Sequence, residues 1–353
     1  MSLNDIKEKL KKYSNENGVS GNEKNISNML MEDLKEYSSN IRIDSLGNLI
    51  AYHKKYDKNN KTIMLAAHMD EIGLMVKQID DKGFLKFIGI GGWFNQTLLN
   101  QRVVVHGKKG DILGVIGSKP PHVMKEEDLK NPILMKDMFI DIGADNENNA
   151  KELGVDIGTY ITIDRDFKEL SNNKVTCKSF DNRAGIVILI ETMKKLNEKN
   201  INVNVCSVGT VQEEVGLKGA RTSANGIKPD YAIAIDTTIP GDHPGITKED
   251  STLEIGKGPV ITIADASGRG LLTHPFILEN LKEIAIKNNI PYQLDVSDGG
   301  TTDATAIHLT NEGVPTGVIS IATRYIHSPV EVLNLNDINS CVDLIVKFIE
   351  NLK

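Results

Sequence analysis

The spacing of hydrophobic and polar residues predicts alternating strands and helices in the second half of the chain. The last segment carries apolar residues at a 3.6-residue period from Ile338 to Leu352, with Asn336 as the expected N-cap, and is predicted to be a helix. Alternation of strands and helices indicates an α/β domain. The other strands are predicted at residues 202–211, 231–235, 259–263 and 318–322, and the other helices at residues 182–196 and 275–287.

The first 72 residues carry a similar pattern. Residues 1–20 form a polar, helix-like opening, and residues 41–52 are typical of two strands joined by a turn at Gly47. Residues 62–67 form a continuous apolar run, which is typical of a strand buried on both faces. This run predicts a sheet that is covered by helices on both sides.

The segment between these two parts does not show this alternation of strands and helices. Residues 73–164 contain short β-like runs separated by glycines, with a short helix expected near residues 146–153. We therefore predict an α/β fold with a central mixed sheet flanked by helices and an inserted small β-barrel-like domain. The catalytic domain is expected at residues 1–72 and 165–353, and the inserted domain at residues 73–164.

Composition narrows the class of protein. The chain has 353 residues, of which 40% are hydrophobic and 25% charged, as in globular domains, and its net charge of −7 argues against broad nucleic-acid binding. No apolar run is long enough for a membrane span, and the charged N-terminal stretch does not resemble a signal peptide. The three cysteines are odd in number and far apart, so we expect buried thiols and a cytoplasmic protein.

Acidic and imidazole side chains gather where predicted strands end. In open α/β sheets, ligands bind at that edge. His68 and Asp70 share one face of an extended chain, so the carboxylate is placed to hold the imidazole in one tautomer. Taken alone, the pair is equally typical of a solvated turn.

The other candidates also have plain structural interpretations. Asp181 precedes a helix and is suited to capping it, and Asp236 ends a strand as many turn residues do. His327 is compatible with a hydrogen-bonded loop. Glu213 and Glu214 are adjacent, so burying both is costly unless cations or protons compensate, although a solvated loop would avoid the cost.

Considered together, these residues favour metal chemistry. Imidazole and carboxylate ligands suit Zn²⁺, Co²⁺ or Mn²⁺. Two histidines and three carboxylates are enough for two metal ions if one carboxylate bridges, and one glutamate is then free for proton transfer. This is the inventory of a two-metal hydrolase. The residues alone do not decide which glutamate has which role.

Six stretches of the chain, in this order, resemble the M42 family of metallo-aminopeptidases, the tetrahedral or glutamyl aminopeptidase group. The inserted β-rich segment also looks like the small second domain of that family. The stretches are AAHMDEIGLMV (66–76), KSFDNRAG (178–185), VQEEVGLKGA (211–220), AIDTT (234–238), DGGTTDATAI (298–307) and RYIHSP (324–329).

The resemblance implies a role for each candidate ligand. His68 and Asp236 would bind one divalent metal ion, and Glu214 and His327 the other, with Asp181 bridging the two. Zinc or cobalt is the expected metal, and manganese is the next choice.

The resemblance also implies an activity and an assembly. Glu213 would be the general base, and Asp70 would orient His68. The expected function is a co-catalytic aminopeptidase that releases N-terminal residues from short peptides, working as a homo-oligomer, by resemblance a dodecamer, through the inserted domain. No nucleic-acid or membrane partner is expected. The alternatives are a metal-dependent hydrolase of glycans or acylated amino acids, and a catalytically silent metal-binding assembly protein.

Overall fold

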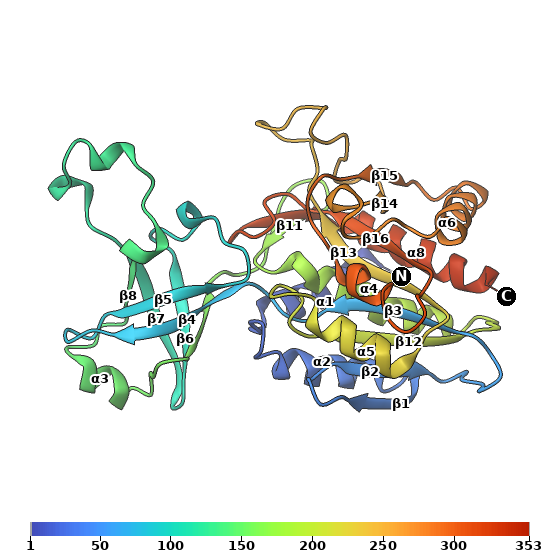
Figure 1. Cartoon of the computed structure of the whole chain (residues 1–353), viewed down its shortest axis with the longest axis horizontal. Coiled ribbons are helices and arrows are strands. Elements are labelled where there is room, and N and C mark those ends of the chain that lie inside the picture. The colour runs from blue at the N-terminus through green and yellow to red at the C-terminus, as the bar shows by residue number, and fades with distance from the viewer. Residues whose placement is uncertain (1, 353) are drawn as a thin grey trace.

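The computed structural model describes residues 2–352 and contains one large sheet beside a small barrel (Figure 1). The four central strands of the large sheet, β12, β3, β13 and β16, run parallel, and antiparallel neighbours flank them on both sides. The predicted central mixed sheet is confirmed. Its strands, in spatial order, are β1 (Ser38–Ile43), β2 (Leu49–His53), β12 (Asn204–Thr210), β3 (Thr62–His68), β13 (Tyr231–Thr238), β16 (Thr316–Ala322), β14 (Val260–Ala264) and β15 (Gln293–Val296).

Helices cover both faces of this sheet, because successive side chains of a strand point to opposite faces. In β3, Ile63 and Leu65 pack into the larger core with one set of helices, whereas Met64 and Ala66 pack on the other side. The helices of the larger core are α1 (Leu3–Asn15), α2 (Lys24–Leu34), α4 (Phe180–Leu196), α6 (Pro275–Lys287) and α8 (Leu335–Asn351). The opposite face is covered by α5 (Lys218–Ile227) and α7 (Asp303–Ile307).

The cap of the last helix lies two residues earlier than predicted. Asn334 is the N-cap of α8, and its side chain accepts a hydrogen bond from the backbone N–H of Asn336 at 3.0 Å. The prediction of Asn336 as the cap was therefore wrong. Leu335 is buried and extends the apolar stripe of the helix by one position, so the helix starts there.

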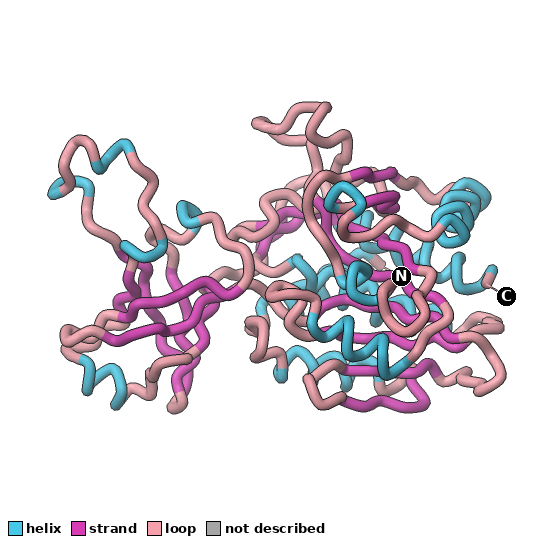
Figure 2. Tube along the Cα trace, in the orientation of Figure 1, coloured by secondary structure: helices cyan, strands magenta, loops and turns pink. Residues whose placement is uncertain are grey.

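The barrel is closed and antiparallel, and loops with short helical segments connect its strands (Figure 2). It has its own apolar core, in which Leu74, Val103, Ile140 and Ile161 are fully buried. The barrel-like insertion in the predicted fold is confirmed, as is its short helix, α3 (Glu147–Glu152). In spatial order the strands are β4 (Gly73–Ile79), β5 (Leu85–Ile90), β8 (Phe139–Asp141), β7 (Gly110–Gly117), β6 (Arg102–Gly107) and β9 (Tyr160–Ile163).

Short 3-10 turns complete the helical structure. Four lie in the connections of the barrel and one follows β14. They are η1 (Asn95–Thr97), η2 (Pro121–Val123), η3 (Asp128–Lys130), η4 (Met135–Asp137) and η5 (Ala266–Gly268).

A third, small sheet joins two distant parts of the chain. It consists of β10 (Lys168–Glu169), β11 (Lys174–Cys177) and β17 (Glu331–Asn334), which pair antiparallel. Cys177 pairs with Glu331, so the residues that lead into α4 lie beside the residues that follow the loop after β16.

The expectation for the cysteines is confirmed, because Cys177, Cys206 and Cys341 are all free and buried. Among residues 2–352, no helix combines the length and the apolar character that crossing a membrane would need.

Candidate active site

The four parallel strands carry most of the candidate residues to one edge of the sheet. His68 is the last residue of β3, and Asp236 lies near the end of β13. Glu213 and Glu214 follow β12, while His327 follows β16. Since Thr210 pairs with His68 across β12 and β3, the loop with the two glutamates begins next to His68. The predicted convergence on one sheet edge is therefore present in the structure.

Asp181, at the start of α4, lies between the two histidines. One oxygen, Oδ1, is 3.1 Å from Nε2 of His68, and the other, Oδ2, is 3.4 Å from Nε2 of His327. On its other side, His68 Nε2 lies 3.7 Å from Asp236, and His327 Nε2 lies 3.2 Å from Glu214. The residues thus form two half-sites that share one carboxylate.

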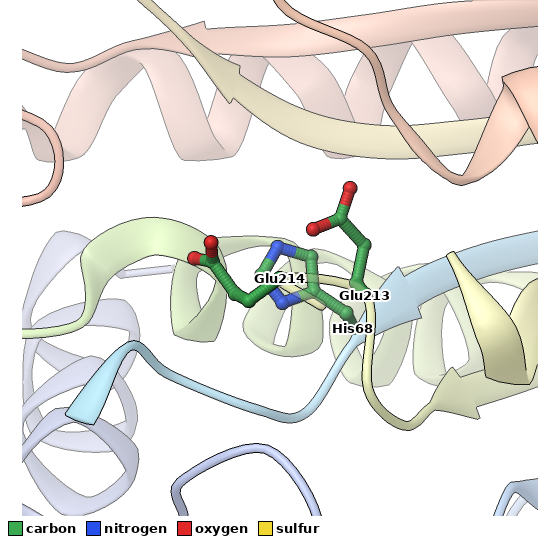
Figure 3. A group of neighbouring side chains, drawn as sticks. All are labelled: His68, Glu213 and Glu214. Atoms are coloured by element: carbon green, nitrogen blue, oxygen red, sulfur yellow. The ribbon is translucent and has the colours of Figure 1, made fainter. Parts of the chain in front are cut away.

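These half-sites are compact enough to hold metal ions. Potential ligand atoms of His68, Asp181 and Asp236 lie within 4.8 Å of one another, and so do those of Asp181, Glu214 and His327. Glu213 belongs to a separate group with His68 and Glu214, and not to either group that contains Asp181. In Figure 3 the carboxylates of Glu213 and Glu214 point in different directions, on either side of the His68 ring.

Asp70 connects the histidine to the two glutamates. Its backbone oxygen lies 3.1 Å from Nδ1 of His68, and its carboxylate lies 3.6 Å from the same atom. The carboxylate also accepts hydrogen bonds from the backbone N–H groups of Glu213, at 3.0 Å, and Glu214, at 3.1 Å, and from Ser20 Oγ at 2.6 Å. Asp70 therefore fixes the orientation of His68 relative to the glutamate loop.

Burial and neighbouring charges shift the pKa values of Glu213 and Asp181 in opposite directions. Burial raises the pKa of Glu213 well above its usual range, and the opposing effect of His68 is too small to offset the burial and the nearby Asp236 and Asp303. Burial would also raise the pKa of Asp181, but hydrogen bonds from His327 and His68 hold it below its ordinary value. Adjacent acids in one site thus have different protonation tendencies, as proton-transfer chemistry requires.

A cluster of buried charged side chains connects the segment after β3 to the start of α4. Glu71 accepts a hydrogen bond from the backbone N–H of Gly18 at 2.9 Å and forms ion pairs with Lys178, at 2.7 Å, and Arg183, at 3.4 Å. All three charged side chains are buried. Lys178 and Arg183 flank Asp181 in sequence, so the cluster ties the start of α4 to the residue that follows Asp70.

The barrel also contributes to the wall of the site. Gly92 and Trp93 follow β5, and Trp93 lines the same small pocket as Asp181, Glu214 and His327. A Cβ atom built on Gly92 would lie 3.1 Å from Nδ1 of His327, which is closer than ordinary packing. A side chain at position 92 would therefore require the His327 ring to shift by a few tenths of an ångström.

Sequence reasoning missed two buried carboxylates near these residues. Glu331 accepts hydrogen bonds from the backbone N–H groups of Asp181 and His327, and Asp303 accepts one from the hydroxyl of Thr210. A signal for Glu331 was present, since it is a lone charge within the otherwise apolar run of β17. Asp303 lies at the start of α7, where an acidic residue is commonplace.

The donor set fits divalent metal ions. Imidazole nitrogens and carboxylate oxygens are the ligands that Zn²⁺, Co²⁺ and Mn²⁺ share. Oε1 of Glu214 is buried and has no hydrogen-bond partner among the described residues. A buried carboxylate oxygen without a partner is costly unless a cation neutralises it.

Comparison with known proteins agrees with this geometry. A family model described as M42 glutamyl aminopeptidase matches residues 47–344. A relative from Acetivibrio thermocellus, whose name describes it as an aminopeptidase, is 43% identical over 351 residues, which cover 99% of this chain and 100% of the relative.

Two solved structures show the same fold at comparable identity. The aminopeptidase APDkam598 from the archaeon Desulfurococcus kamchatkensis is 44% identical, with a TM-score of 0.94 over 99% of this chain and 96% of that chain. The TET1 peptidase of Pyrococcus horikoshii, which can assemble into a tetrahedron or a large octahedral shell, is 36% identical. Its TM-score is 0.88 over 98% of this chain and 100% of that chain.

Proposed function

The chain belongs to the M42 family of aminopeptidases, which are peptide hydrolases, and from this premise we propose that it removes N-terminal residues from short peptides at a pair of divalent metal ions. The observation that carries the proposal is the position of Asp181, whose two oxygens face two different histidines. A carboxylate in this position is suited to bridging.

The ligands divide into two sets about Asp181. His68 and Asp236 would hold one ion, and Glu214 and His327 would hold the other, in line with the two groups of ligand atoms that include Asp181. When bound, the two ions would lower the pKa of a water molecule toward neutrality and polarise the substrate carbonyl. Zinc and cobalt are the metals that this mixture of nitrogen and oxygen ligands suits best, with manganese next.

Glu213 acts as the general base. It takes a proton from the attacking water and returns it to the leaving amine, so no net proton is consumed in the step. Glu213 is in neither of the two ligand groups that contain Asp181, and its raised pKa suits a group that both accepts and donates a proton. Asp70 holds the backbone of Glu213 and keeps His68 in one orientation.

The match to an aminopeptidase family supports a substrate with a free N-terminus. Seven buried or half-buried carboxyl groups surround two imidazoles: Asp70, Asp181, Glu213, Glu214, Asp236, Asp303 and Glu331, against His68 and His327. Two divalent ions would offset much of this negative charge, so side-chain charge alone does not select the ammonium group of a peptide. An N-acetylated peptide, which lacks that group, tests the requirement.

We further propose that the chain forms a closed homo-oligomer, by analogy a dodecamer, with its barrel at the contacts. The assembly of related TET peptidases supports this proposal. Such enclosure would restrict substrates to short peptides. The three free, buried thiols fit a reducing cytoplasm as the working compartment.

The test compares two neighbouring substitutions in metal-reconstituted protein, with a panel of aminoacyl substrates. Glu213→Gln is expected to keep both metal ions and lose about a thousandfold or more of its turnover, because the water loses its base. Glu214→Gln is expected to lose metal as well, since it removes a ligand.

An N-acetylated peptide and cellooligosaccharides serve as control substrates, and neither should be cleaved. Near-parental turnover in the Glu213→Gln variant would remove Glu213 from its role. Cleavage of cellooligosaccharides in place of peptides would favour a glycan hydrolase.

A further inference from the structure

Glu331 is a buried carboxylate that holds two of the proposed metal ligands by their backbone. Its Oε2 accepts a hydrogen bond from the N–H of Asp181 at 2.9 Å, and its Oε1 accepts one from the N–H of His327 at 3.2 Å. The residue is only 2% exposed. One side chain therefore connects the shared aspartate to the histidine of one half-site.

The N–H group of Asp181 needs this external partner. It lies at the start of α4, where Asp181 and Asn182 have non-helical backbone angles and the N–H has no partner within the helix. Ser179, the N-cap residue, has a left-handed backbone conformation and makes no capping hydrogen bond with its side chain. The carboxylate of Glu331 supplies the acceptor that a capping side chain would normally provide.

The loop with His327 also depends on outside contacts. Tyr325 and His327 both have positive φ angles, 61° and 59°, which non-glycine residues keep only where their surroundings hold them. Backbone hydrogen bonds between Arg324 and Val332, at 2.8 and 3.0 Å, close the base of this loop. Glu331 precedes the closing residue, and its side chain reaches back to the N–H of His327.

The small sheet places Glu331 where it can contact both segments. In the register of β11 and β17, Glu331 pairs with Cys177, four residues before Asp181. The backbone of Glu331 is therefore fixed beside the approach to α4, while the loop after β16 lies on its other flank.

We propose that Glu331 is a positioning residue, which sets the spacing between Asp181 and His327 and so the affinity of the Glu214–His327 half-site for its metal ion. This inference rests on the two-metal site of the proposed function. Groups that hold metal ligands in place typically contribute about 10- to 100-fold in affinity. Loss of Glu331 is expected to have an effect of that size.

The experiment is a titration of the metal-depleted full-length chain with Co²⁺, followed by the visible absorption of the bound ion. The parent is compared with Glu331→Gln, which keeps the size of the side chain but loses one acceptor oxygen. It is also compared with Glu331→Asp, which keeps the charge but is too short to reach both N–H groups.

Asp337 provides a matched control. It is 1% exposed and, like Glu331, accepts two backbone hydrogen bonds, from Gly256 at 2.6 Å and Gly258 at 2.8 Å. These glycines are not part of the site. Asp337→Asn therefore makes the same kind of change to a buried carboxylate at a place where metal affinity should not respond.

The expected result is that both Glu331 variants bind the second Co²⁺ about tenfold or more weakly than the parent, while Asp337→Asn matches the parent. Parental affinity in Glu331→Asp overturns the inference, because charge alone would then account for any loss in Glu331→Gln. If Glu331→Gln does not fold, as judged by circular dichroism, Glu331→Asp decides alone. A parent that fails to bind two Co²⁺ ions contradicts the proposed function itself.

Discussion

Individual carboxylates in this site differ by the contacts that each one makes. Asp181 faces both histidines, Asp70 accepts backbone N–H groups, and Glu213 is buried near Asp236 and Asp303. The same functional group is thus suited to bridging, positioning or proton transfer according to its partners. The residue type alone therefore does not determine the role of a carboxylate in this site.

Replacement of the shared aspartate should affect both half-sites at once. We expect Asp181→Ala to lose both metal ions along with activity, because each ion would lose a ligand. Metal content after gel filtration, measured by atomic emission, checks this outcome. Two ions per chain in the purified variant would contradict the assignment of Asp181 as the bridge.

His53 gives a prediction about stability, remote from the site. Burial lowers the pKa of this histidine to about 4 in the folded chain, and the positive charge of the nearby Lys55 makes a smaller contribution in the same direction. The unfolded chain therefore binds a proton before the folded chain does, so stability is present above about pH 6.5 and is lost as the pH falls toward 4. The loss attributable to His53 is of order 2–3 kcal/mol.

Urea unfolding between pH 7 and pH 4.5 measures this effect. His53→Gln should lose less stability over that range than the parent, whereas a substitution of the exposed His122 should leave the pH dependence unchanged. Parallel curves for the parent and His53→Gln would show that His53 titrates normally.

At the scale of elements, the loop after β5 reaches from the barrel to the metal half-site. A Cβ on Gly92 would crowd the His327 ring, so Gly92→Ala should move the ring by a few tenths of an ångström. We expect kcat to fall about tenfold, since small displacements of reacting groups have large effects on rate. Steady-state kinetics on a short peptide measure the change.

Gly226→Ala is the matched control for this substitution. Gly226 lies in α5, where a Cβ would meet only the end of the Arg42 side chain at 4.0 Å. Alanine there should leave kcat unchanged. If the two alanine variants have equal kcat values, the close approach of the loop to His327 does not affect the rate.

The sequence predicts elements well where the apolar pattern is long. The run in β3 and the periodic stripe of α8 are such cases. In contrast, α5 is short and contains Gly219, Gly226 and few large apolar residues, so a search for large apolar side chains does not find it. The small sheet was not predicted, because strands of two to four residues carry no period and form only through distant pairing.

Contacts between distant parts of the chain also limit what the sequence predicts about the site. Ligands at strand ends are visible in the sequence, since each polar residue follows an apolar run. Their proposed division into two half-sites came from family resemblance and stays a prediction, and the structure places one oxygen of Asp181 beside each histidine. Asp303 was missed because its partner Thr210 lies 93 positions away, and the lone charge of Glu331 does not by itself reveal its contact with Asp181, 150 positions away.

At the scale of the whole molecule, the barrel presents apolar side chains on its outer surface. Leu113 is 69% exposed and Val115 is 48% exposed, and they alternate along β7 with the buried Gly114 and Ile116. Exposed apolar residues on an adjacent pair of outward positions are suited to contact with another copy. This supports the barrel as the assembling part of the proposed oligomer.

Substitution of this surface should separate assembly from chemistry. We expect the Leu113→Asp and Val115→Asp double variant to sediment as a smaller species than the parent, because charge opposes burial of the contact. Its kcat on a dipeptide substrate should change little. Lys77→Asp, at an exposed position of β4, is the control and should sediment like the parent. A monomeric parent would contradict the proposed assembly.

The wide distribution of the proposed ligands along the chain has a consequence for biosynthesis. The first, His68, ends β3, and the last, His327, follows β16, which lies on the other side of β13 in the central sheet. A ribosome must therefore release nearly the entire polypeptide before any ion can be captured by the full set. Metal binding by the complete set would then occur only after translation and folding are finished. A prematurely terminated product would stay inactive.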